Sequence, residues 1–87
     1  MKIKENFILR KVADSYIVVP VGSMTLNFNG IINLNETGAF LFEKLQQGAG
    51  REDLINALLE EYDVAPERAE NDVDIFIQKV RDADVLE

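Results

Sequence analysis

The pattern of apolar and polar positions changes character near the middle of the chain. In the first half, two stretches rich in β-branched and aromatic residues, Phe7–Val12 and Tyr16–Val19, flank the turn-forming residues Ala13-Asp14-Ser15. Such stretches separated by a short polar turn predict a pair of β-strands. Pro20 has no amide hydrogen to give to a sheet, so it marks the end of the second strand or an unpaired edge.

A hairpin is predicted next, because Asn29-Gly30 lies between the apolar runs Thr25–Phe28 and Ile31–Leu34. A two-residue turn would mix polar and apolar side chains on one face of this hairpin. A three-residue connection would instead gather four apolar side chains on one face. We therefore expect the second register, with a bulge near Gly30.

Helical spacing takes over in the second half, which predicts three helices at about Glu36–Gln47, Arg51–Tyr62 and Pro66–Ala83. Asn35 has the side chain of a helix N-cap, and Gly48 is suited to end the first helix. The first helix is apolar around much of its circumference, which is typical of a central buried helix. The second helix is expected to bury Leu54, Ile55, Leu58, Leu59 and Tyr62. The third is expected to bury Ala69, Val73, Phe76, Val80 and Ala83, and Val85 and Leu86 are expected to fold back as an apolar tail.

Together these elements predict an α+β fold. A small antiparallel sheet of three to four strands (residues 1–34) precedes a three-helix bundle (residues 35–87). Helices gathered beside such a sheet give a winged-helix-like arrangement. The length predicts a single domain over residues 1–87.

Charge is distributed unevenly along the chain, whose net charge is −7. Residues 1–51 carry six basic and four acidic groups, whereas residues 52–87 carry three basic and twelve acidic groups. An acidic helical half repels a phosphate backbone, so we expect no nucleic-acid partner and argue against a winged-helix transcription regulator. The same acidity either steers a basic partner or simply keeps a small domain in solution.

Catalytic chemistry is hard to place in this sequence, which contains no histidine and no cysteine. The commonest general base, the commonest metal ligand and all thiol chemistry are therefore excluded. Gly48-Ala49-Gly50 lacks the strand and third glycine of a phosphate-binding loop, and the carboxylates do not alternate as in a calcium loop. We expect no enzyme activity, no cofactor and no metal. Without a long apolar run or a secretory signal, we also expect no membrane partner and a cytoplasmic location.

An interaction surface is the remaining kind of site, and two features suggest where it lies. An open sheet has unpaired edges that can accept an extended peptide as an added strand. On the third helix, the helical period places Arg68, Asp72, Ile75 and Lys79 together beside the buried stripe. Ile75 either lines a shallow groove there or is a single exposed apolar residue.

Several spaced motifs resemble the pyrroloquinoline quinone (PQQ) synthesis protein D family, whose members are similar to the recognition elements of ribosomally made, modified peptides. The likeness extends over nearly the whole chain. It rests on the order of the segments Leu34-Asn35-x-Thr37-Gly38-Ala39-x-x-Phe42, Leu54-x-x-x-Leu58-x-x-x-Tyr62, Asp72-Val73-x-x-Phe76-Ile77-x-x-Val80 and Val85-Leu86.

This resemblance implies a domain without catalysis of its own that binds the leader segment of a precursor peptide. The peptide would add to the third strand, against the third helix, and be presented to a modifying enzyme, commonly a radical S-adenosylmethionine enzyme. Carried onto this chain, the implied peptide-binding residues are Ile31, Ile32, Asn33, Leu34, Asp72, Ile75, Phe76 and Lys79.

The chain departs from the family pattern after Pro20, where about a dozen residues precede the Leu34-Asn35 signal instead of a short Pro-Glu turn. A related peptide-modification pathway therefore fits as well as PQQ synthesis, and either sheet edge could be the docking strand. A structural or regulatory homodimer that pairs through the same edge is the alternative function.

Overall fold

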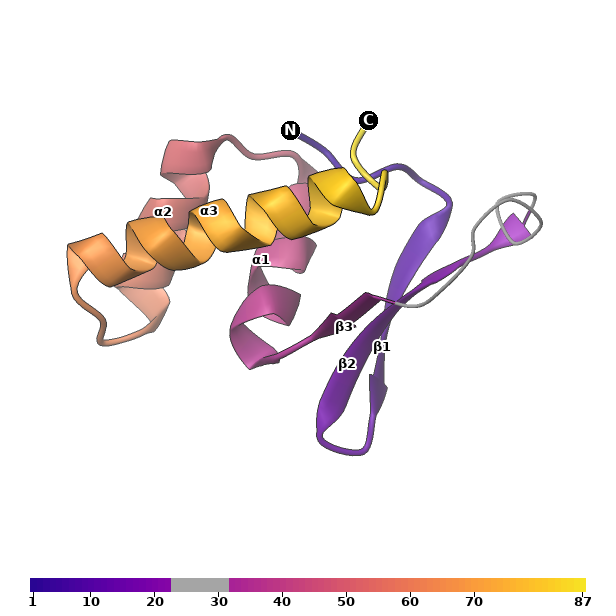
Figure 1. The fold of residues 1–87 in the computed structure, drawn as a ribbon, viewed down its shortest axis with the longest axis horizontal. Helices are drawn as coiled ribbons and strands as arrows, with labels where there is room; N and C mark the ends of the chain where they lie inside the picture. Colours follow the sequence, from indigo (N-terminus) through magenta and orange to yellow (C-terminus); the bar gives the residue numbers. More distant parts are fainter. Residues whose placement is uncertain (23–31) are drawn as a thin grey trace.

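The computed structural model describes residues 1–22 and 32–87 and contains three strands followed by three helices (Figure 1). The elements are β1 (Phe7–Val12), β2 (Ser15–Pro20), β3 (Ile32–Leu34), α1 (Glu36–Gln47), α2 (Arg51–Glu61) and α3 (Pro66–Asp82). This order confirms the predicted α+β, winged-helix-like class. Ile31 and the predicted Thr25–Phe28 strand, Asn29-Gly30 turn and bulge lie outside the described residues.

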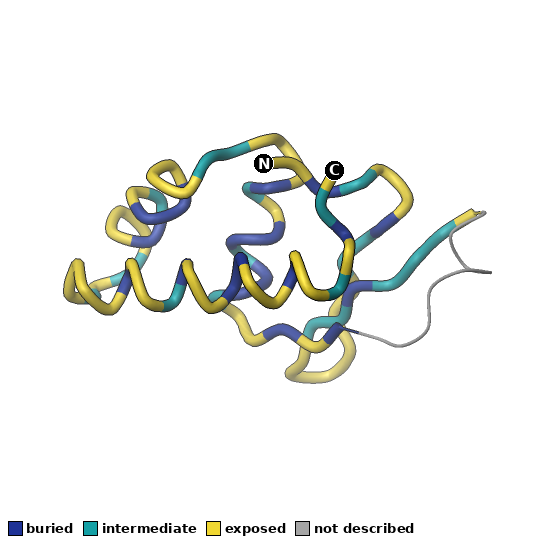
Figure 2. The backbone as a smooth tube through the Cα atoms, turned by 45° about the horizontal axis from the view of Figure 1, so that its top comes forward, coloured by how far each residue is buried: buried dark blue, intermediate teal, exposed yellow. Residues whose placement is uncertain are grey.

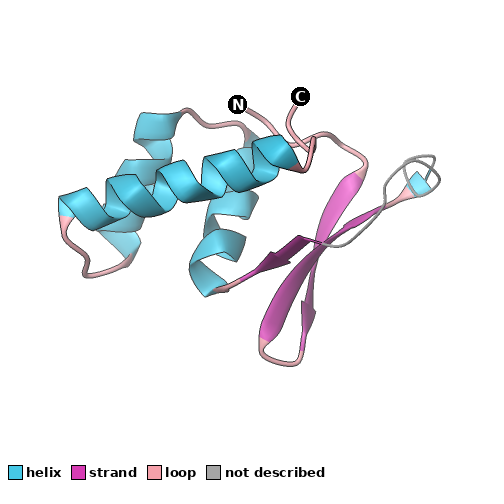
Figure 3. Cartoon of the chain, in the orientation of Figure 1, coloured by secondary structure: helices cyan, strands magenta, loops and turns pink. Residues whose placement is uncertain are grey.

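The described strands form one antiparallel sheet in the order β1-β2-β3. β2 pairs with β1 along its whole length, and it pairs with β3 through Tyr16 opposite Leu34 and Val18 opposite Ile32. Within residues 1–22 and 32–87, β2 is the one strand that pairs with β3, and no strand in this part of the chain pairs with the far side of β3. Strands gather at one end of the molecule and helices at the other, with α1 between them (Figure 3).

α1 is the central helix, as its all-round apolar sequence predicts, because it contacts α2, α3 and all three strands. Its buried side chains include Leu41, Phe42 and Leu45, which join one core with Val18 of the sheet. In Figure 2, buried positions recur along the side of each helix that faces this core. Ile3 and Val85 are also buried, and Ile3 pairs with Leu86, so the predicted apolar tail does fold back and lies beside the N-terminal segment.

Helix ends follow their sequence signals closely. The Asn35 side chain accepts a 2.7 Å hydrogen bond from the Gly38 amide in the first turn of α1. Gly48 ends α1 with a φ of 91°, a left-handed conformation that glycine adopts without a steric penalty. Pro66 occupies the first turn of α3, where its missing amide hydrogen costs nothing.

Small differences from the predicted elements are confined to ends and flanks. α2 and α3 each stop one residue early, at Glu61 and Asp82, and β2 is one residue longer at each end. Leu59 was predicted to be buried but is 37% exposed, whereas Leu58 is 1% exposed. Leu59 is therefore on the flank of the buried stripe, because consecutive residues on a helix differ in direction by about 100°.

Candidate functional site

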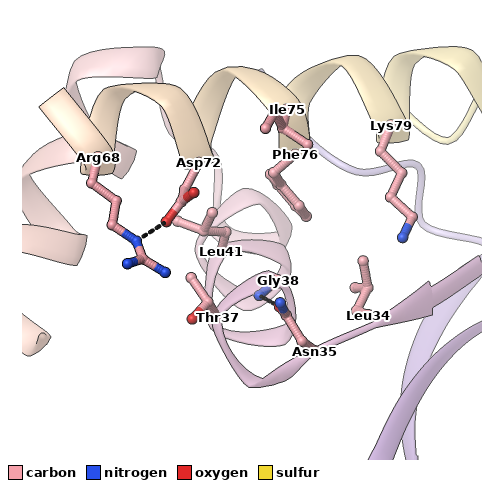
Figure 4. A pocket seen from close by; sticks show the side chains of 10 residues that line it. All are labelled: Leu34, Asn35, Thr37, Gly38, Leu41, Arg68, Asp72, Ile75, Phe76 and Lys79. Atoms are coloured by element: carbon pink, nitrogen blue, oxygen red, sulfur yellow. Dashed lines mark hydrogen bonds and ion pairs between the residues drawn. The ribbon is translucent and has the colours of Figure 1, made fainter. Parts of the chain in front are cut away.

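A hollow of about 250 Å³ lies between β3, the start of α1 and the middle of α3 (Figure 4). Its lining comes from three parts of the sequence, which only the fold brings together. The lining residues are Leu34, Asn35, Thr37, Gly38, Leu41, Arg68, Asp72, Ile75, Phe76 and Lys79. We call this hollow the β3–α3 groove.

The α3 wall of the groove contains all four α3 residues that the sequence suggested. Asp72, Ile75, Phe76 and Lys79 line it together with Arg68, which shares their flank of the helix. Phe76 is 4% exposed and belongs to the core as well, whereas Ile75 is 60% exposed. Ile75 therefore presents apolar surface at the groove that nothing in the described chain covers.

The floor of the groove comes from the first turns of α1, which sequence reasoning did not assign to the site. Gly38 allows the helix to approach β3 closely, since an added Cβ would meet the Leu34 Cδ2 at 3.2 Å. Thr37 and Leu41 continue the floor beside it. In sequence, this segment has only the signals of a helix start, so its place beside α3 was not predictable from local pattern.

The β3 wall offers main-chain groups as well as a side chain. The side chains of Ile32 and Leu34 are buried at 7% and 6% exposure, and the Asn33 side chain is exposed. The Lys79 Nζ donates a 2.6 Å hydrogen bond to the Asn33 carbonyl oxygen. That oxygen is therefore directed toward α3 rather than toward β2.

The predicted strand residues differ in the direction of their main-chain groups. A residue turns its N–H and C=O to the same side, and its neighbours turn theirs to the other side. Asn33 thus directs both groups away from β2, while those of Ile32 and Leu34 face β2. Leu34 lines the groove with its side chain, but Ile32 packs into the core and does not line it.

Charged side chains stand at both ends of the groove. The Arg68 Nε lies 3.7 Å from the Asp72 Oδ2, and Lys79 lies two turns further along α3. Two cations and one carboxylate therefore line a groove in a chain whose net charge is −7.

The described part of the chain has few side chains arranged to bind a metal ion or to act as a general acid or base. There, no group of three acidic residues is arranged to hold a metal ion, and no polar or charged side chain is buried. Nor does any helix among the described residues have the length and apolar character needed to cross a bilayer. The site therefore consists of a shaped groove, main-chain hydrogen-bonding groups and charged side chains at the surface.

Fold and groove together define a small winged-helix-like domain whose groove lies between β3, the start of α1 and the last helix. Residues 16–86 match the family model described as coenzyme PQQ synthesis protein D (PqqD), and the chain belongs to this family. The predicted family is thereby confirmed. A comparison with curated proteins found no match.

Two solved structures share the fold. TbiB1, in complex with the TbiA(beta) leader peptide, superposes with a TM-score of 0.77 at 21% identity, covering 100% of this chain and 95% of that one. Lasso peptide synthetase B1, complexed with the leader peptide, gives a TM-score of 0.69 at 18% identity, covering 93% of this chain and 89% of that one. At these identities the likeness establishes the architecture, which agrees with the sheet and helices described above.

Proposed function

We propose that this chain binds the leader segment of a ribosomally made precursor peptide and presents it to a modifying enzyme, without catalysing the modification itself. The peptide adds as a strand along Ile31–Leu34 and lies against Asp72, Ile75, Phe76 and Lys79 of α3. The observation that carries the proposal is the Asn33 carbonyl, which accepts a hydrogen bond from the groove residue Lys79 and not from any strand in the described part of the chain. Family membership and the leader peptides named in both structural neighbours support it.

Strand addition fits the physical character of this groove. Main-chain hydrogen bonds give affinity in such complexes, and side-chain pockets give specificity. The Asn33 N–H and C=O supply the main-chain pair, and the hollow between Leu34 and Phe76 accepts side chains that alternate along the bound strand. Because the chain has no histidine or cysteine, we assign the chemistry to the partner enzyme.

The partner enzyme is expected among those that modify ribosomally made peptides, for example a radical S-adenosylmethionine enzyme, acting in the cytoplasm. A short open reading frame beside a gene for such an enzyme would identify the precursor. Its leader segment, made synthetically, is the probe for the test.

Titration of isotope-labelled protein with this leader peptide tests both the function and the site. The amide signals of Asn33, Leu34 and the Asp72–Lys79 stretch of α3 should shift together. In hydrogen exchange, the Asn33 amide should gain protection on binding, while the amides of Ile32 and Leu34, already paired with β2, should change little. Shifts confined to other elements would refute the site, and no binding at sub-millimolar peptide would refute the function.

A homodimer through the same edge is the second candidate, since an open edge can pair with its own copy. Antiparallel self-pairing about Asn33 would bring two Lys79 ammonium groups together. This repulsion favours a peptide over a second copy. Sedimentation separates the two candidates, because a tight dimer that no peptide dissociates would support the homodimer.

A further inference from the structure

Lys79 occupies the place that a docked strand would take on β3. Its Nζ donates to the Asn33 carbonyl oxygen at 2.6 Å, across 46 residues of sequence. In a strand-addition complex, the acceptor on this edge receives a main-chain N–H from the added strand. The ammonium group of Lys79 therefore donates to the same oxygen that a peptide amide would use.

The charge of Lys79 has no carboxylate partner in the described part of the chain. Its partner there is a neutral carbonyl oxygen, and the groove's one carboxylate, Asp72, pairs with Arg68 instead. An ammonium group gains more from a carboxylate than from a carbonyl, because hydrogen bonds between charged groups are the stronger ones. Lys79 is thus available for an anionic group that arrives with the ligand.

The charge of the groove also differs in sign from that of the molecule. Arg68 and Lys79 outnumber Asp72 along the lining, although acidic residues outnumber basic ones by seven in the whole chain. A local excess of positive charge acts at short range, within a Debye length of about 8–10 Å at physiological salt. This positive charge therefore acts mainly on charged side chains of the peptide segment that lies in the groove.

We infer that Lys79 makes this groove selective for a leader peptide that carries Asp or Glu at one fixed position. The inference rests on the proposed function and specifies the chemistry of its ligand. The incoming strand takes over the Asn33 carbonyl with a main-chain N–H, and the displaced ammonium group pairs with the peptide carboxylate.

Strand geometry fixes where that carboxylate must stand. Residues directly opposite each other on paired strands point to the same face of the sheet. The peptide residue opposite Asn33 therefore points away from the core, and its two neighbours point the same way as Leu34, toward α3. The acidic residue is expected at one of these two neighbouring positions, within reach of Lys79.

Random peptides displayed on phage are a suitable probe, because they can be used before the precursor peptide is identified. Selection is run on the wild-type chain, on Lys79→Met and on Arg81→Met. Methionine keeps most of the length of the lysine stem and removes its charge. Arg81 is the matched control, since it is an exposed cation on α3 that does not line the groove.

Selection on wild type and on Arg81→Met should both enrich apolar peptides with an acidic residue at one fixed position. Selection on Lys79→Met should enrich peptides that lack this acidic residue. In a synthetic wild-type-selected peptide, Glu→Gln should weaken binding to wild type by roughly two- to fivefold, the range of exposed ion pairs, and leave Lys79→Met unaffected. An equal loss on both proteins, or no loss on wild type, would overturn the selectivity while leaving peptide binding intact. If no selected peptide moves the amide signals of β3, both the selectivity and the proposed function fail.

Discussion

Arg51, the first residue of α2, forms a two-pronged contact with Asp74 in the middle of α3. Its Nε and a terminal guanidinium nitrogen donate to the two carboxylate oxygens at 2.7 and 3.0 Å. Such paired hydrogen bonds fix the orientation of both side chains. The contact joins two helices on the side away from the groove lining, so it tests the stability of the helical half separately from binding.

Asp74→Asn is expected to lower the midpoint of thermal unfolding at pH 7. The hydrogen bond from Arg51 is the main reason why the pKa of Asp74 is lowered below its ordinary value of 3.8. A lowered pKa in the folded chain stabilises the fold above the pKa of the unfolded chain. The difference between wild type and variant should therefore shrink as the pH falls below 3.8 and vanish once the folded carboxyl is protonated.

Thermal scans at a series of pH values measure this effect. Asp63→Asn is the matched control, because Asp63 is exposed in the connection between α2 and α3. A difference for Asp74→Asn that persists in strong acid would show that the carboxylate charge is not the cause. Added salt should reduce the difference at pH 7, since the pair is exposed to solvent.

Asn35→Ala is expected to reduce the free energy of unfolding by about 1 kcal/mol, the usual cost of losing an N-cap. The variant removes the oxygen that accepts the Gly38 amide hydrogen at 2.7 Å. Asn35→Asp retains a capping oxygen and should remain close to wild type. Urea unfolding at constant pH measures both variants, and equal losses for Ala and Asp would contradict the capping role.

Leu58→Ala and Leu59→Ala form a matched pair within α2. Leu58 is 1% exposed and Leu59 is 37% exposed, although they are adjacent and chemically identical. Leu58→Ala should cost about 2–5 kcal/mol of unfolding free energy through lost burial and a new cavity. Leu59→Ala should change it by about 0.5 kcal/mol or less. Similar values for the two variants in urea unfolding would mean that the buried face of α2 is assigned wrongly.

Local sequence signals account for most of the fold. Asn35, Gly48 and Pro66 mark helix ends through their own backbone and side-chain chemistry, and these ends lie where predicted. Leu59 was misjudged because a helical period alone does not say how wide the buried stripe is. The width depends on the neighbouring element, here α3, which the local pattern does not contain.

The groove was only half predictable, for a similar reason. Arg68, Asp72, Ile75 and Lys79 share one flank by helical spacing, so their common wall follows from the sequence of α3 alone. The floor at Gly38 depends on how α1 packs against both β3 and α3, which is a contact between distant segments. Which residue of β3 turns its main-chain groups outward depends on the pairing with β2, and the Lys79–Asn33 contact assigns these groups to Asn33 and not to Ile32.

Asn33→Pro should therefore weaken leader binding more than Asn33→Ala. Proline removes the amide hydrogen that faces the groove, while alanine keeps it and removes only the exposed side chain. Circular dichroism establishes that both variants are folded before their peptide affinities are compared by calorimetry. Equal affinity for both variants would mean that the Asn33 amide gives no hydrogen bond to the peptide.

Ile75→Ala should weaken leader binding by about fivefold and leave unfolding unchanged. The side chain is 60% exposed in the free chain, so shortening it disturbs little of the core. We assume that a docked peptide covers roughly half of the carbon surface that the substitution removes. At about 0.8 kcal/mol per buried CH₂ group, the free energy of binding then weakens by about 1 kcal/mol, which is about a fivefold lower affinity. Leu59→Ala is the control, since Leu59 is an exposed apolar residue on α2 that does not line the groove. Isothermal calorimetry with the leader peptide measures both variants. If both bind as tightly as wild type, Ile75 is an ordinary exposed residue and the peptide contacts α3 elsewhere.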